Sequence, residues 1–381
     1  VLAIPFATGD LDLSGSGTVT DVLPDGRVLA FGHAMDGIGD RALPMYTGYV
    51  HYVVPLRSIS FKLSGSLAPA GSVIRDEQSA VGGLSETRYG TAPVKVRVKL
   101  PNQDEQVYKY QVLEDQPITP GIMAAVVGQS VGAVQQLPRE NTLRMKGKLR
   151  FEGSREIELD VIQARATSQA VAASVAPVGA ALMNNPFERI KLESAEIEVE
   201  VEPKSRIASI SDIWIDRTQV APGESVGINV EFRRLRGETF IKRIEFEIPE
   251  DADEGDYQLT IGDAATYVQR LTGTHPHYSR ARNVDQLARA IQRLNAFRSD
   301  AVYLMLTMPE TTGLAVGTQE LPDLPSSRVA LLTGQAGSRV TPYADLEEKI
   351  VPMDDVISGS LEMVINVRDP YATTPKADAA E

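Results

Sequence analysis

The sequence predicts a mainly β protein with a barrel-like N-terminal domain, connector helices and an immunoglobulin-like β-sandwich that carries a helical insertion. Two observations predict this class. Short runs that alternate apolar and polar residues recur along the chain, with turn-forming residues between them. The length of 381 residues allows two or three domains. We place the first domain at residues 1–162, the helical connector at 163–186, the sandwich at 187–370 and a disordered tail at 371–381.

A β-hairpin near the start of the first domain delivers a histidine into a glycine-rich loop. β-branched residues at 18–22 predict its first strand, Pro-Asp-Gly at 24–26 its turn, and residues 28–31 its return strand. His33 follows the return strand, and the chain has only four histidines. A catalytic base needs rigid placement of this kind. The same pattern is also typical of a histidine that caps a strand with a satisfied ring nitrogen.

The rest of the first domain alternates in the manner of antiparallel strands with one solvent-facing side. One helix, near residues 119–136, interrupts the strands, because Thr119-Pro120 suits a helix start and apolar residues then recur at helical spacing. The connector also has one apolar helical face, and we expect Pro177 to kink it. The predicted strands span residues 94–100, 106–113, 143–151 and 156–162.

The second domain shows short strands at the spacing of a β-sandwich. The sole tryptophan, Trp214, is expected in the core between the sheets. A helix is predicted at residues 283–298, because Asn283 and Gln286 suit a capping box and an apolar stripe follows. Such a stripe usually belongs to the core. The predicted strands span residues 195–202, 207–215, 226–232, 241–248, 257–261, 301–308 and 360–367.

Two further patterns were weighed as chemical sites. Residues 128–132 match the G-x-S-x-G nucleophile elbow, but the helical spacing around them places Ser130 inside a helix instead of between a strand and a helix. His275-Pro276-His277 and the acidic run at 249–256 lack the additional ligands of a zinc or calcium site. Both are interpreted as turns. The sequence therefore predicts no metal and no cofactor.

Composition excludes several function classes. The formal net charge is -13, and lysine and arginine are not clustered as they would be along a phosphate-binding surface, so we expect no nucleic-acid partner. The absence of cysteine excludes disulfides, thiolate zinc sites and cysteine nucleophiles. The longest apolar stretch, residues 122–134, is interrupted by polar residues and is too short to cross a bilayer. We expect no transmembrane span in this chain.

The N-terminal segment resembles a known peptidase family. Its Gly-Thr-Val-Thr strand at 17–20, Ala-Phe-Gly-His at 30–33, Leu-Pro-Met at 43–45 and the segments at 60–63 and 71–76 are similar to the SpoIVB-type serine peptidase domain, family S55. The similarity covers residues 1–100 best. It is closest to large exported bacterial proteins in which a β-rich region follows this domain. The resemblance implies a periplasmic or cell-envelope location.

One family motif is missing from this sequence. The family nucleophile lies in a Gly-Met-Ser-Gly-Ser-Pro loop, which does not occur here; the Ser-Gly-Ser triplets at 14–16, 64–66 and 358–360 are interpreted as turns. In longer exported relatives, the serine loop can lie upstream of the histidine segment. The start at Val1, without an initiator methionine or a signal sequence, leads us to expect a truncated or processed chain.

The resemblance implies that His33 is a general base, oriented by Asp76 or Asp36. A solvated loop position is the alternative for both aspartates. Two functions remain open. The first is a cell-envelope scaffold or binding protein on an S55-like fold. The second is a serine endopeptidase, or one processed portion of it, whose serine comes from a missing upstream segment. The expected partners are proteins or a polypeptide substrate, including the protein's own N-terminal segment.

Overall fold

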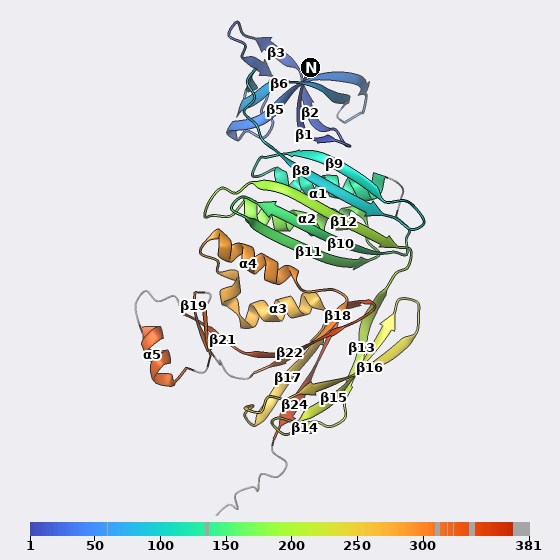
Figure 1. Ribbon diagram of the computed structural model, residues 1–381, viewed down its shortest axis with the longest axis vertical. Coiled ribbons are helices and arrows are strands. Elements are labelled where there is room, and N and C mark those ends of the chain that lie inside the picture. The colour runs from blue at the N-terminus through green and yellow to red at the C-terminus, as the bar shows by residue number, and fades with distance from the viewer. Residues whose placement is uncertain are drawn as a thin grey trace, which may run out of the picture. The chain divides into compact units, whose positions relative to one another are not determined.

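The computed structural model describes residues 1–58, 60–133, 137–308, 313–317, 319–322, 324–334 and 340–368 (Figure 1). The prediction of a mainly β protein is confirmed. The predicted tail at 371–381 and the end of the helix predicted near 119–136 lie outside the described residues. The chain forms two compact units. The first comprises Val1–Arg139, Leu143–Asp160 and Ala166–Glu202, and the second comprises Glu140–Thr142, Val161–Arg165 and Pro203–Glu381.

The N-terminal part of the first unit is a set of antiparallel strands. Short strands lie beside one long hairpin, and the buried side chains of both form a small core around Ile4, Leu43 and Val73. Tight turns hold the short strands together, which agrees with the predicted Pro-Asp-Gly turn. The strands are β1 (Leu2–Gly9), β2 (Leu13–Gly17), β3 (Val19–Val22), β4 (Val28–Ala30), β5 (Gly39–Val54), β6 (Phe61–Glu77) and β7 (Ala80–Leu84).

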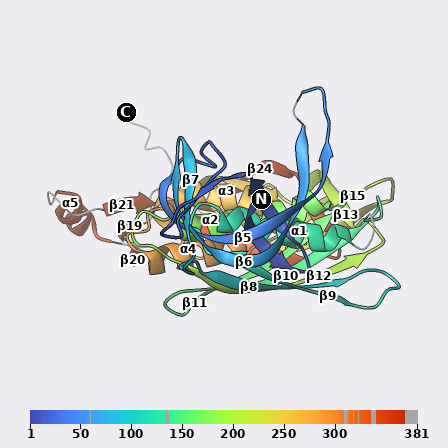
Figure 2. The ribbon, with the colours of Figure 1, turned by 90° about the horizontal axis from the view of Figure 1, so that it is seen from above.

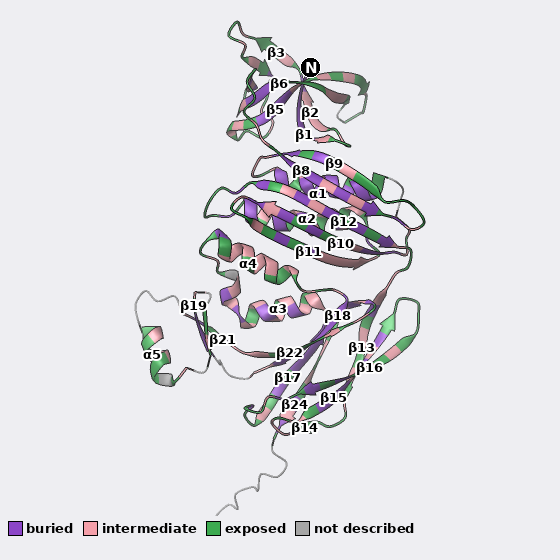
Figure 3. Cartoon of the chain, in the orientation of Figure 1, coloured by how far each residue is buried: buried purple, intermediate pink, exposed green. Residues whose placement is uncertain are grey.

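The same sheet continues through the remainder of the first unit. Its order runs β11-β10-β12-β8-β9-β1-β5-β6-β7-β4-β3, with β2 added on β1. Along β8, β10 and β12, buried and exposed residues alternate, as the sequence predicts (Figure 3). The added elements are β8 (Thr91–Lys99), β9 (Gln106–Leu113), α1 (Thr119–Ala133), β10 (Thr142–Phe151), β11 (Arg155–Ala164), α2 (Ser168–Met183) and β12 (Leu192–Glu202).

Two elements belong to the first unit although we placed them elsewhere. The helix within the predicted connector at 163–186 is α2, which packs against α1 through the buried face that includes Val171 and Val175. Strand β12 was assigned to the sandwich domain, but it pairs in parallel with β8, from Ala195 beside Val94 to Glu200 beside Lys99. A local pattern shows which face of a strand is apolar. It does not show which distant strand that face joins.

The second unit contains two sheets around one hydrophobic cluster. Their orders are β16-β15-β13-β23 and β14-β24-β17-β18-β22, and Phe232, Leu259 and Leu304 are among the fully buried residues of the cluster. These strands are β13 (Ile207–Ile215), β14 (Gln219–Val220), β15 (Ser225–Arg234), β16 (Thr239–Glu247), β17 (Gly255–Gly262), β18 (Ala301–Thr307), β22 (Leu346–Pro352), β23 (Val356–Ser358) and β24 (Ser360–Val367).

The expectation for Trp214 is wrong. This residue is 39% exposed on β13, and the cluster between the sheets is filled by aliphatic, phenylalanine and tyrosine side chains instead. Helical segments and a three-stranded sheet, of order β20-β19-β21, complete the second unit. They are α3 (Ala264–Thr274), a 3-10 turn (Pro276–Ser279), α4 (Val284–Asn295), β19 (Gly313–Val316), β20 (Gln319–Pro322), α5 (Ser326–Gly334) and β21 (Val340–Tyr343).

Helix α4 lies within the predicted range 283–298 and begins as expected. The Asn283 side chain accepts a hydrogen bond from the backbone amide of Gln286 at 2.9 Å. Its apolar stripe is less buried than predicted, because only Val284 is fully buried and Leu294 is 36% exposed.

Candidate functional site

His33 stands at the end of the predicted hairpin, where the backbone leaves the strand abruptly. β3 and β4 pair from Val19 beside Ala30 to Val22 beside Val28. The next two residues, Phe31 and Gly32, both have left-handed backbone angles, with φ of 72° and 73°. Glycine adopts this conformation freely, but phenylalanine does so at an energetic cost. This local strain turns the chain so that His33 is exposed to solvent.

The carboxylate of Asp76 fixes the loop that follows His33. Asp76 lies on β6 and is 1% exposed. Its Oδ1 accepts a hydrogen bond from the amide of Met35 at 2.7 Å, and its Oδ2 accepts from the amides of Asp36 and Gly37 at 2.7 and 2.8 Å. Burial opposes ionisation of this carboxyl, but the three amides and Arg41 outweigh it, so the pKa of Asp76 is lowered from its usual 3.8.

Arg41 joins this loop to a distant part of the first unit. Its side chain is 2% exposed and lies on β5. The guanidinium pairs with Asp36 at 2.7 Å and donates to both carboxylate oxygens of Asp115, at 2.9 and 3.3 Å. Its Nη1 also lies 3.9 Å from Asp76 Oδ2. Sequence reasoning missed Arg41 and Asp115, because 74 residues separate them and neither belongs to a motif.

The ring of His33 is held at one nitrogen. Its Nδ1 lies 2.6 Å from the backbone oxygen of Ala34, and its ring centroid lies 5.9 Å from that of Phe31. When Nδ1 carries the proton and donates it to this carbonyl, Nε2 keeps its lone pair and can accept a proton from another group. The Nδ1 atom of His33 is therefore held by a backbone carbonyl and not by a carboxylate.

The two predicted orienting carboxylates have other partners. Asp76 binds backbone amides of the loop, and Asp36 binds Arg41. Neither makes a hydrogen bond to His33 within the part of the chain that the structure describes. The structure therefore brings His33, Asp36 and Asp76 together in and around one loop. The two carboxylates bind the loop backbone and Arg41, and the imidazole contacts the carbonyl of Ala34.

The other serine and histidine motifs do not form a catalytic group with His33. Ser130 lies inside α1, where its hydroxyl donates to the backbone oxygen of Val126 and lies 2.8 Å from the hydroxyl of Tyr110. This agrees with the helix that the spacing around Ser130 predicts and excludes the nucleophile elbow. The hydroxyls of Ser64 and Ser66 bond to Ser16 and Asp12.

His275 and His277 lie in the second unit, buried in an aromatic cluster. The His275 ring stacks on Tyr278 and Tyr343 at centroid distances of 5.1 and 5.2 Å, and His277 Nε2 lies 2.8 Å from Glu320. Throughout the described ranges, no group of three or more His, Cys, Asp or Glu side chains is arranged to hold a metal ion.

A pH dependence follows for His275. Burial is the main cause that lowers its pKa from 6.5; His277 and Arg293 lower it too, whereas Glu320 and Asp345 raise it. The unfolded chain therefore binds a proton that the folded unit excludes, so stability is full above about pH 6.5 and falls as the pH drops below it.

We expect the loss of stability at acidic pH to be smaller in His275→Phe, because this substitution keeps the ring stacking and removes the titrating group. Urea unfolding followed by Trp214 fluorescence at neutral and mildly acidic pH checks it, with His51→Phe as the exposed control. An equal loss of stability in His275→Phe and in the parent protein would contradict the assignment.

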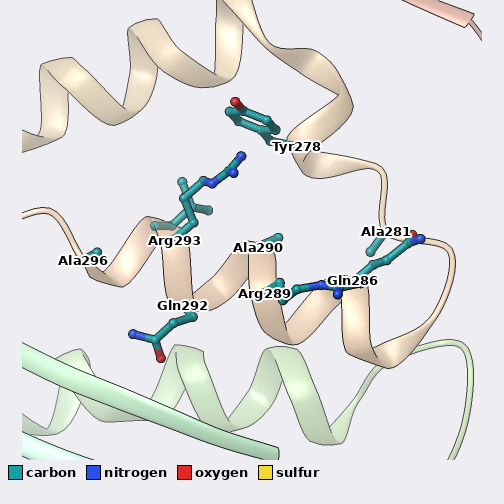
Figure 4. A pocket seen from close by; sticks show the side chains of 9 residues that line it. Tyr278, Ala281, Gln286, Arg289, Ala290, Gln292, Arg293 and Ala296 are labelled. Atoms are coloured by element: carbon teal, nitrogen blue, oxygen red, sulfur yellow. The ribbon is translucent and has the colours of Figure 1, made fainter. Parts of the chain in front are cut away.

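A separate pocket lies along α4 in the second unit (Figure 4). Its cavity volume is about 510 Å³, and the Arg293 guanidinium lies over the Tyr278 ring at 4.2 Å. Burial raises the pKa of Tyr278 to about 12, so this phenol stays protonated at neutral pH. The described lining offers no carboxylate, histidine or aliphatic hydroxyl. The lining residues are Tyr278, Ala281, Gln286, Arg289, Ala290, Gln292, Arg293, Leu294 and Ala296.

Comparison of the chain with protein-family models, with curated proteins and with solved structures gave no match. The resemblance to the S55 domain therefore depends on the quoted residues alone. None of the helices that the structure describes has the length and apolar character needed to cross a membrane.

Proposed function

We propose that this chain is a binding or scaffold module of an exported cell-envelope protein, built on an S55-like fold, and that it is not a complete peptidase by itself. The observation that carries this proposal concerns the His33 ring. Within the described residues, its only hydrogen bond is to its own loop, at Ala34, and no hydroxyl group is hydrogen-bonded to it. A general base must lie within hydrogen-bond reach of the proton that it removes.

The architecture of the second unit supports a binding role. Two β-sheets around one core form a rigid support, and immunoglobulin-like sandwiches commonly present binding loops in this manner. We include an immunoglobulin-like classification of the second unit in the proposal. The pocket on α4 adds a recess whose arginine and glutamine side chains suit a polar or anionic group of a ligand.

A test treats the purified 381-residue chain with a serine-directed phosphonate and maps any labelled peptide by mass spectrometry. We expect no labelled serine, because no hydroxyl of the residues that the structure describes is hydrogen-bonded to His33. A serine labelled in this chain, with labelling lost in His33→Gln and kept in the exposed control His51→Gln, would overturn the proposal.

A second function, a serine endopeptidase completed by an upstream segment, is favoured by the accessible Nε2 of His33. Nδ1 is engaged, the ring is exposed, and a buried carboxylate fixes the loop. This arrangement would let an external serine hydroxyl approach a correctly protonated imidazole. The intact natural protein would then be labelled by the phosphonate on its serine loop, and His33→Gln would abolish labelling. Labelling nowhere in the folded natural protein excludes this second function.

A further inference from the structure

The hairpin of β5 and β6 extends beyond the strands that flank it. β1 pairs with β5 only as far as Tyr46 and Thr47, and β7 pairs with β6 only from Ser72 onward. Residues 49–54 of β5 and 61–67 of β6 therefore form a two-stranded ribbon that projects from the rest of the first unit (Figure 2). We name residues 49–67 the arm. A free two-stranded hairpin is only marginally stable in water.

The two faces of the arm differ. On one face, Lys62 donates to Thr18, and Ser64 bonds to Ser16 on β2, at 3.2 and 2.6 Å. The opposite face is apolar, because cross-strand neighbours share a face and the register places Tyr52 beside Leu63 and Val54 beside Phe61. Tyr52, Leu63 and Phe61 are 62%, 54% and 50% exposed. Contiguous apolar exposure of this kind marks an interaction surface.

The charge of the arm distinguishes it from the rest of the chain. Residues 41–75 include four basic side chains and no acidic one, although the protein carries 51 acidic residues and a net charge of -13. Arg57 and Lys62 are the two cations of the arm, and both residues are exposed. The net charge of the remaining residues is consequently more negative than -13, and the positively charged arm is complementary to that negative charge.

We propose that the apolar face of the arm docks on the same face of a second copy of this chain, across a two-fold axis. An uncharged face is complementary to itself, so no like charges meet at its centre. Arg57 is exposed in the connection between β5 and β6 and can approach the acidic surface of the other copy. Insertion into lipid is a poorer fit, because the outer edges of the arm carry strand amides and carbonyls that hydrocarbon would leave unpaired.

The first experiment measures self-association by sedimentation velocity over a range of concentrations. We expect a concentration-dependent dimer that Tyr52→Lys weakens at least about tenfold, because buried aromatic anchors dominate interface energies. Ile241→Lys is the matched control, since Ile241 is 57% exposed on β16 in the second unit. It should leave association unchanged.

A second experiment uses the absence of native cysteine. Leu63→Cys places one thiol on the apolar face with little change in size, and mild oxidation should give a disulfide-linked dimer. Ile241→Cys should give no disulfide-linked dimer beyond the amount that random collisions produce. A parent protein that stays monomeric, together with equal cross-linking of the two variants, would overturn the proposal. Binding of the monomer to anionic phosphatidylglycerol vesicles through Tyr52 would also overturn it. Neither test involves His33, so failure here is distinct from failure of the proposed function.

Discussion

Replacing Asp76 with alanine is expected to lower the free energy of unfolding of the first unit by about 3 to 5 kcal/mol. The substitution leaves three backbone amides, those of Met35, Asp36 and Gly37, without their buried acceptor and leaves Arg41 with one fewer carboxylate nearby. The loop that carries His33 should lose its fixed conformation as well. Hydrogen exchange at these three amides measures the local effect, and urea unfolding monitored by exchange across β5 and β6 measures the global one.

The same carboxylate predicts a response to acid. The folded-state pKa of Asp76 is lowered from 3.8, so its contribution to stability is complete above about pH 3.8 and is lost as the pH falls through the lower folded value. Asp76→Asn keeps the shape but cannot ionise, so we expect a flatter dependence of stability on pH in that range.

Two controls separate the loss of the Asp76 hydrogen bonds from a general destabilisation of the protein. Glu77→Ala removes an exposed carboxylate from the next position on β6, and we expect a change within about 0.5 kcal/mol. Trp214 is the sole tryptophan and lies in the second unit, so its fluorescence should follow an unfolding transition that Asp76→Ala does not change. Equal protection of the three loop amides in Asp76→Ala and in the parent protein would show that the carboxylate does not hold the loop.

The loop that Asp76 binds shows which parts of the candidate site could be predicted from the sequence. The turn residues and β-branched strands of the hairpin are local signals, so the position of His33 at its end was predictable. The resemblance to the S55 domain also gave Asp76 as a candidate partner of His33. It did not show that Asp76 binds the backbone of the loop instead of the imidazole. A carboxylate that arrives beside a histidine from a distant segment can bind the imidazole or the backbone, and only the fold decides which donors face it.

Long-range pairing limited the prediction of the fold in the same way. The alternation of β12 correctly gave a strand with one buried face, yet its partner β8 lies about a hundred residues earlier, and the pairing moved β12 to the first unit. The exposure of Trp214 has a related cause. Its strand was predicted, but side chains point to alternate faces of a strand, and the register placed the indole on the outer face.

Substituting Gly71 with alanine is expected to destabilise the hairpin of β5 and β6 by about 2 to 5 kcal/mol, the sum of a left-handed backbone penalty and of overpacking. Gly71 has φ of 134°, and a Cβ there would lie 1.9 Å from the backbone oxygen of Leu84 on β7. Because this neighbour is backbone, the clash cannot be relieved by a side-chain rotation. The strands must separate.

Gly39→Ala is the matched control for this substitution. Gly39 also has a left-handed φ, of 85°, on the same hairpin, but no atom lies within 4 Å of its missing Cβ, so only the backbone penalty of about 1 to 2 kcal/mol should appear. Gly71 stands beside a register shift that separates the buried end of the hairpin, with Asp76, from the arm. Thermal unfolding and hydrogen exchange should therefore show that Gly71→Ala exposes both the loop amides that Asp76 binds and the strand amides of the arm. Equal destabilisation by the two substitutions would mean that the close approach of Leu84 does not constrain this bend.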